Sequence, residues 1–323
     1  MLCAAGVLWG TGGVLGSALA ERTGLVPTLV AAGRLGLGGL FLLTYLGVTG
    51  VPFPRGTRAW ARIGLLATLS AVFQSCYFAS IAVGSVSAAT LVTIGSVPVS
   101  LVLLDAIRTR ARPTLPDLRA TLVGVAGLAL VVAGSTDRSA VAGAAMEGGA
   151  VGSSGGGALG HLLALASGLS FALTAAVSRR PVANLDARSG IAYGFVVAGA
   201  MLLVGTTPWA PASVALDART LGLLAGLALV PTAVAYGAYF RGLPRASAAT
   251  AGVTTLLEPL TATVLAVIVL GDRPTWLTWA GAVLLLLSVV DAARHGSTAG
   301  PQGHVDPATP VPRSALHGAT GHR

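Results

Sequence analysis

The sequence predicts an all-α integral membrane protein with ten transmembrane helices arranged as two inverted five-helix repeats. Its composition, its long apolar stretches and a set of residues that recurs in its second half support this fold class. Of the 323 residues, 54% are hydrophobic and 10% are charged, and the mean hydropathy is +0.81. Soluble domains carry charge on roughly a quarter of their residues, so this composition favours a chain embedded in a lipid bilayer.

Charged or Pro/Gly-rich segments separate the apolar stretches along the chain. Each stretch approaches the length of about 20 helical residues that crosses the hydrocarbon core. The expected spans are 2–20, 25–48, 63–82, 86–104, 118–134, 159–178, 189–207, 220–240, 247–270 and 275–291.

These spans define the expected domains. A first five-helix repeat covers 1–134 and a second covers 159–292. Residues 135–158 between them are rich in Gly, Ala and Ser, which is typical of a flexible linker. Residues 293–323 contain four of the five histidines among prolines and glycines, and we expect a disordered cytoplasmic tail there.

The net charge of +9 comes from arginine, because the sequence has no lysine. With the N-terminus placed inside, 15 arginines fall in inside segments, 4 fall in outside segments and Arg34 lies within a span. Positive residues gather on the cytoplasmic side of membrane proteins. The charge therefore predicts an N-in, C-in topology and a lipid bilayer as partner, and it does not indicate nucleic acid.

Short motifs recur in the same order in both halves. Ser87-Ala88-Ala89-Thr90 returns as Ser247-Ala248-Ala249-Thr250, and a Tyr-Phe pair precedes each copy. A proline follows each copy, Pro98 in the first half and Pro259 in the second. Five spans is an odd number, so the second half enters the membrane from the opposite side, as in many secondary transporters.

Several motifs resemble a known family. They are Leu8-Trp9-Gly10, Arg34, Leu257-Glu258-Pro259 and Gly271-Asp272-Arg273-Pro274-Thr275. Through them the chain resembles the EamA-like branch of the drug/metabolite transporter superfamily over residues 1–292. The resemblance implies two EamA repeats, export or exchange of small metabolites, and a plasma membrane location, the inner membrane in a prokaryote. The second half departs from the pattern, with Ser167-Gly168 in place of Trp9-Gly10 and no counterpart of Arg34.

Arg34 and Glu258 are the two charges deep within apolar spans. At 1.5 Å per residue they lie roughly 14 and 16 Å from opposite faces, near the bilayer midplane. A charge is costly there, so it normally faces the bundle interior. Glu258 then binds a substrate amine or exchanges a proton, and Arg34 meets a carboxylate or holds Glu258. The alternatives are a fixed structural ion pair, or an Arg34 side chain that reaches the outer interface.

Polar and aromatic residues in the spans are further candidates for lining a substrate site. They are Trp9, Gln74, Tyr77, Tyr236 and Tyr239, with core packing or an interfacial belt as the alternative. Pro98 and Pro259 kink their helices and are candidate hinges, or packing kinks alone. Pairs of small residues such as Gly12 and Gly16 permit close helix contact, within the chain or across a homodimer.

The sequence favours a secondary transporter over an enzyme. It has no phosphate-binding GxxxxGK[ST] loop and no HExxH zinc motif, and we expect no cofactor and no metal. The expected substrate is a small molecule such as an amino acid or a drug, moved by alternating access with or without proton coupling. A lipid translocase or a channel on the same helices stays open, and an intramembrane enzyme is the third alternative.

Overall fold

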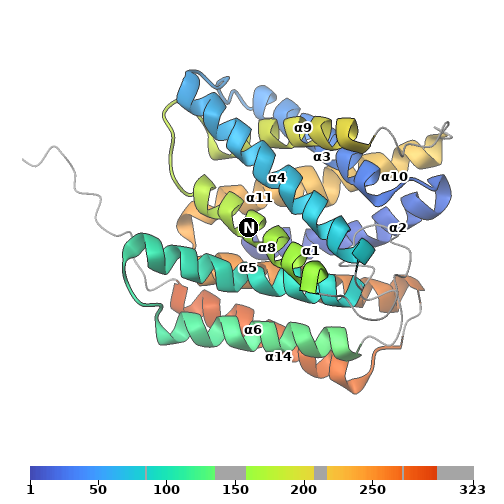
Figure 1. The fold of residues 1–323 in the computed structure, drawn as a ribbon, viewed down its shortest axis with the longest axis vertical. Helices are drawn as coiled ribbons and strands as arrows, with labels where there is room; N and C mark the ends of the chain where they lie inside the picture. The colour runs from blue at the N-terminus through green and yellow to red at the C-terminus, as the bar shows by residue number, and fades with distance from the viewer. Residues whose placement is uncertain (84–85, 135–157, 207–216, 271–272, 297–323) are drawn as a thin grey trace, which may run out of the picture.

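The computed structural model describes residues 1–83, 86–134, 158–206, 217–270 and 273–296 (Figure 1). Within these ranges the regular structure is helical, apart from one isolated β-bridge between Val182 and Leu185. The expected linker at 135–158 lies outside the described residues except for its last residue, which begins a helix. Most of the expected tail also lies outside them, but its first four residues continue the last helix to Gly296.

Among the described residues, ten helices are long and apolar enough to cross a membrane, which confirms the expected number of spans. We number the spans first to tenth in chain order. The first half contains α1 (Leu2–Trp9) with α2 (Thr11–Thr23), α3 (Pro27–Val48), α4 (Thr57–Val83), α5 (Val86–Thr109) and α6 (Leu115–Gly134). The sixth and seventh spans are α8 (Ala158–Ser178) and α9 (Ala187–Thr206), and the tenth is α14 (Trp276–Gly296).

The eighth and ninth spans are each built from several consecutive helical segments. The eighth contains α10 (Ala218–Ala228), the π-helix η2 (Leu229–Val234), α11 (Ala235–Gly242) and the 3₁₀ turn η3 (Leu243–Arg245). The ninth contains α12 (Ala248–Val253), the 3₁₀ turn η4 (Thr254–Leu256), α13 (Leu257–Leu265) and the π-helix η5 (Ala266–Leu270). Such departures from α-helix inside a span are typical of functional sites.

Local sequence features set several helix ends. Pro27 occupies the first turn of α3, where its missing N–H costs nothing. Asp217 caps α10 by accepting from the Thr220 N–H at 2.8 Å, and Ser247 caps α12 through the N–H of Thr250 at 3.0 Å. These caps satisfy backbone donors that the helix itself leaves without acceptors.

The two halves pack as a pseudo-two-fold pair. Two glycines show how closely the helices approach, because a side-chain carbon added at either one would clash with the backbone of a neighbouring helix. A Cβ on Gly6 would lie 2.3 Å from the Thr254 carbonyl oxygen, and one on Gly168 would lie 2.4 Å from the Thr93 carbonyl oxygen. Thr93 and Thr254 each lie five residues before the interior proline of their own half. The first span therefore packs on the ninth as the sixth packs on the fourth.

Two pairs of repeat-related helices occupy opposite edges of the bundle. α6 packs along α14 at one edge, and α3 packs along α9 at the other (Figure 1). Glycines allow the close approach, since a Cβ on Gly39 would lie 2.7 Å from the Ala192 oxygen and one on Gly199 would lie 2.8 Å from the Ala32 oxygen. These contacts hold the halves together and leave the first, fourth, sixth and ninth spans around the centre.

The outside of the bundle is apolar. Large hydrophobic side chains such as Val204, Leu122 and Trp276 point away from the neighbouring helices and are exposed. Exposing such an apolar surface to water is unfavourable in free energy, whereas lipid chains can pack against it. The fold is therefore that of an integral membrane protein that crosses the bilayer several times.

Candidate functional site

A cavity of about 50 Å³ lies where the two halves meet. Seven of the ten spans contribute to its wall. The lining residues are Trp9, Arg34, Phe73, Gln74, Tyr77, Phe78, Thr93, Ile94, Val97, Phe171, Tyr236, Thr255 and Glu258. The wall includes six of the seven residues that the sequence suggested for binding substrate or a proton, and Tyr239 lies outside it.

The two intramembrane charges reach this cavity from opposite halves. Arg34 extends from α3 and is 3% exposed, while Glu258 lies partly buried in the first turn of α13. The two side chains are close enough to interact electrostatically, and the guanidinium of Arg34 also interacts with the phenol of Tyr236. The cavity thus presents one acid and one base a short distance apart.

Two neutral side-chain donors in the wall form no hydrogen bond with any described residue. They are the indole Nε1 of Trp9 and the amide Nε2 of Gln74, and both are buried. An unsatisfied buried donor costs roughly 1–3 kcal/mol, so such groups normally find a water molecule or a ligand. Their position in the wall makes them candidate contacts for an acceptor group on a bound molecule.

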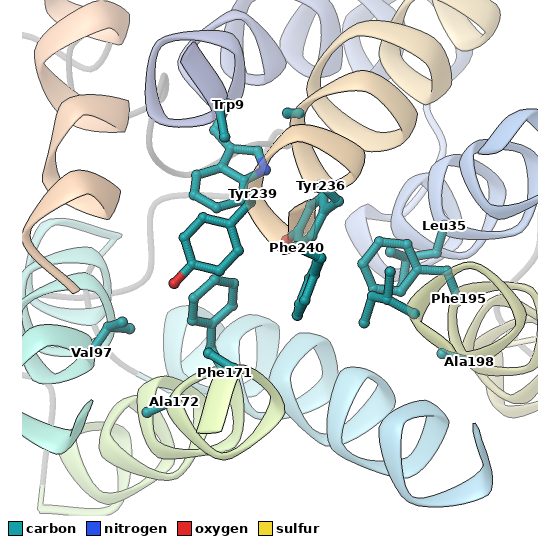
Figure 2. Close-up of a cluster of buried hydrophobic side chains, with 14 of the residues drawn as sticks. Trp9, Leu35, Val97, Phe171, Ala172, Phe195, Ala198, Tyr236, Tyr239 and Phe240 are labelled. Atoms are coloured by element: carbon teal, nitrogen blue, oxygen red, sulfur yellow. The ribbon is translucent and has the colours of Figure 1, made fainter. Parts of the chain in front are cut away.

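Aromatic rings form the apolar part of the wall. The centroid of the Trp9 ring lies 5.0 Å from that of Tyr236, 5.1 Å from that of Tyr239 and 5.9 Å from that of Phe171. Figure 2 shows these rings gathered beneath the first span. Tyr239 is fully buried, and its phenol donates to the Ala251 carbonyl oxygen at 3.2 Å.

The packing also corrects the repeat register around Trp9. Because Gly168 makes the contact equivalent to that of Gly6, the counterparts of Trp9 and Gly10 are Phe171 and Ala172. Ser167-Gly168, which the sequence comparison placed there, lies one helical turn earlier. The two rings then contact each other across the pseudo-two-fold axis, as Trp9 and Phe171 do.

Comparison with known proteins identifies the family. A profile of the EamA-like transporter family matches residues 1–133 and 158–291, which are the two five-helix halves. The chain belongs to the EamA-like transporter family. The transporter is 28% identical over 287 residues to the uncharacterized transporter YwfM of Bacillus subtilis (strain 168), covering 88% of this chain and 90% of that one.

The fold is also that of a protein of known crystal structure. That structure matches with a TM-score of 0.72 at 19% sequence identity, covering 91% of this chain and 95% of the other. The family match and the ten apolar helices make the transporter a multi-pass membrane protein of the drug/metabolite kind.

In this EamA-like transporter, Pro98 and Pro259 interrupt the backbone hydrogen bonding of their spans next to the cavity. A proline cannot donate to the carbonyl four residues earlier, which is Ile94 for Pro98 and Thr255 for Pro259. Both of those residues line the cavity. The fourth span nevertheless stays one α-helix through Pro98, whereas the ninth changes to a 3₁₀ turn just before Glu258.

Arg179 joins two spans by hydrogen bonds at one end of the bundle. This is the arginine-rich end, which carries the connections after the second, fourth, sixth and eighth spans. Arg179 Nη2 donates to the carbonyl oxygens of Ala246 and Ser247, each at 2.8 Å, and so joins the end of α8 to the start of the ninth span. Burial lowers the pKa of the Arg179 guanidinium, while Tyr239 and Asp105 act in the opposite sense.

An ion pair joins the first and eighth spans at the other end. Arg22 contacts Asp217, and its Nε also donates to Thr220 Oγ1 at 3.2 Å. The hydrogen bonds from Arg22 and Thr220 hold the pKa of the Asp217 carboxyl well below its usual range. The pair is solvent-exposed, so its contribution to stability is small.

Sequence reasoning missed several wall residues, among them Phe73, Phe171, Val97 and Thr255. All four are ordinary residues for a membrane helix, so their type gives no indication of function. The positions of Pro98 and Pro259 are the feature that points to some of them, because the residue before each of these two prolines and the residue four before it line the cavity.

Proposed function

We propose that this chain is a secondary transporter that exports or exchanges small amphipathic metabolites such as amino acids, or drugs. The observation that carries the proposal is the cavity between the two halves, which combines Arg34 and Glu258 with two unpartnered donors. A carboxylate would meet Arg34 and the donors of Trp9 and Gln74, and an amine would meet Glu258. The rings of the wall would contact an apolar side chain.

The same arrangement suits alternating access. Two halves of similar structure and opposite orientation can exchange conformations, which opens the central site first to one side and then to the other. The cavity of about 50 Å³ is smaller than the 300 Å³ or more usual for small-molecule sites, so the walls have to separate when substrate enters. The contacts of Arg179 support a conformation closed at the arginine-rich end, which we place in the cytoplasm of the cell.

We test the proposal by counterflow in proteoliposomes loaded with candidate amino acids and small organic cations. Wild-type protein should exchange a labelled substrate saturably, and Glu258→Gln should lower the rate at least tenfold. Glu21→Gln is the matched control, because Glu21 is an exposed acid at the end of α2. Equal exchange by wild type and Glu258→Gln would make Glu258 a structural residue. Wild type that exchanges none of the candidates would favour a lipid translocase or a channel.

Proton coupling is a separate part of the proposal. Glu258 is the acid in the cavity wall, so it is our candidate for carrying the proton. An imposed pH gradient should then drive substrate accumulation in wild type but not in Glu258→Gln, even at substrate concentrations that saturate exchange. Accumulation in the variant equal to that of wild type would contradict a role for Glu258 in coupling.

A further inference from the structure

A second cavity, of about 360 Å³, opens on the outside of the bundle. We call it the lateral groove. It lies between α3 on one side and η2 with α11 on the other, and the start of α9 closes one end. Its walls include Phe41, Leu42 and Tyr45 of α3, and Leu229, Val234 and Gly237 of the eighth span. The groove is therefore separate from the central cavity and faces the surroundings of the protein.

The apolar part of the groove is about as long as one leaflet of a bilayer. Leu229 lies near the middle of the eighth span and Arg241 near its arginine-rich end. The twelve residue steps from Leu229 to Arg241 rise roughly 18 Å, close to the roughly 15 Å of hydrocarbon in a single leaflet. Side chains along this length, such as Val234 at 49% exposure, are left half uncovered by the part of the chain that the structure describes. An acyl chain would fit along this surface.

The polar end of the groove carries positive charge. Arg188 and Arg241 both line it. Arg188 forms an ion pair with Asp186, with 3.1 Å between Arg188 Nε and Asp186 Oδ1. In contrast, Arg241 makes no ion pair with any residue that the structure describes. Tyr45 is 53% exposed beside them and offers a hydroxyl at the same end. Such a cluster at the membrane interface favours an anionic headgroup.

We propose that the lateral groove binds an anionic phospholipid of the leaflet at the arginine-rich end. One acyl chain lies between α3 and η2, and the phosphate is held by Arg241 with Arg188 beside it. Charge and shape agree in this assignment, because the arginines sit at the end of the groove where a headgroup of that leaflet would lie.

The position of this site also suggests what the lipid would affect. The segment η2–α11 presents Val234 and Gly237 to the groove and Tyr236 to the central cavity. A π-helical turn inside a helix is frequent at functional sites, and here the same short segment faces both the groove and the cavity. Lipid in the groove would thereby favour one position of the eighth span.

The test measures lipid retained by the purified full-length protein, using native mass spectrometry. The probes are dioleoyl phosphatidylglycerol and dioleoyl phosphatidylcholine, which share acyl chains and differ in charge. Wild type should retain one phosphatidylglycerol about fivefold more often than one phosphatidylcholine. Arg241→Gln should abolish this preference, and Arg245→Gln, an exposed arginine one turn further along, should keep it.

A second variant examines the acyl slot without changing charge. Val234→Trp should reduce retention of both lipids, because its ring would fill the groove at an exposed position where folding is not at stake. Equal retention of the two lipids by wild type, or an unchanged preference in Arg241→Gln, would overturn the proposal. So would a protein dimer that excludes lipid from the groove. The binding readout is independent of transport, so failure of the proposed transport activity would not affect it.

Discussion

At the scale of single residues, the central cavity differs from ordinary membrane-protein core in its unpartnered donors. The indole N–H of Trp9 and the amide Nε2 of Gln74 are buried in the cavity wall and form no hydrogen bond with any described residue. Arg34 and Glu258 add opposite charges at the same place. The repeat-related positions of these charges are Gly194 and Val97, so the chemistry of the site is asymmetric although its backbone is not.

Replacing Trp9 with Phe tests the indole donor. The substitution removes one N–H and keeps an aromatic ring against Phe171 and Tyr236. If the N–H binds substrate, the half-saturation concentration for exchange should rise about five- to tenfold, the value of one hydrogen bond of about 1 kcal/mol or slightly more. Thermal stability should fall only by the packing lost with the smaller ring, because the indole N–H has no hydrogen-bond partner among the described residues. An unchanged half-saturation concentration would assign Trp9 to packing, and Trp279→Phe at the exposed periphery is the control.

At the scale of elements, the breaks in the first, eighth and ninth spans surround the cavity. The first span is interrupted at Gly10, the eighth by a π-helix and the ninth by a 3₁₀ turn. In the eighth span Pro231 cannot donate to the Leu227 carbonyl, and the Thr232 hydroxyl donates to that oxygen instead at 3.0 Å. Side chains that replace lost backbone hydrogen bonds make such breaks tolerable within a membrane.

The interruption at Gly10 predicts a steric limit. A Cβ at this position would lie 2.5 Å from the Thr261 Cβ and 2.7 Å from the Glu258 carbonyl oxygen. Gly10→Ala should therefore destabilise the protein by about 1–3 kcal/mol through overpacking, with a lower melting temperature in detergent. Gly64→Ala is the matched control, since nothing lies within 4 Å of its added methyl and alanine favours helix. Equal melting temperatures for the two variants would contradict the tight contact between the first and ninth spans.

At the scale of the whole molecule, hydrogen bonds join the sixth and ninth spans at the arginine-rich end. Arg179 donates two hydrogen bonds across this contact. The repeat-related position in the first half is Ser17, whose hydroxyl donates to Gly13 of its own helix at 2.9 Å. The pseudo-two-fold symmetry is therefore broken at this position, and under the proposed alternating-access mechanism this would favour one of the two access states.

Removing the Arg179 side chain should favour opening of that end. In a background with Cys3 and Cys76 replaced by serine, Thr255→Cys places a thiol in the cavity wall. A membrane-impermeant maleimide added from the arginine-rich side should label it at least tenfold faster in Arg179→Ala, because hydrogen bonds from a charged donor contribute about 1.5–3 kcal/mol each and about 1.4 kcal/mol corresponds to a factor of ten. Arg180→Ala, an exposed neighbour, should leave the rate unchanged. Equal labelling in the two variants would show that Arg179 does not hold this end closed.

The sequence by itself determined the number of spans, their approximate limits and the family resemblance. Length and hydropathy are local properties, and a membrane requires each crossing segment to satisfy its own backbone hydrogen bonds. The same reasoning placed Arg34 and Glu258 near one depth, because 1.5 Å per residue converts position in a span directly into height.

Only the tertiary structure decided which side chains meet. The pairing of Trp9 with Phe171, the place of Tyr239 outside the cavity wall and the existence of the lateral groove all depend on how each helix is rotated about its own axis. That rotation is set by contacts between residues far apart in the sequence, such as Gly10 against Thr261 and Gly168 against Thr93 in their separate helix pairs. Small residues permit these contacts in many registers, so the residue pattern of a single helix does not determine its rotation. The packing of the whole bundle determines it.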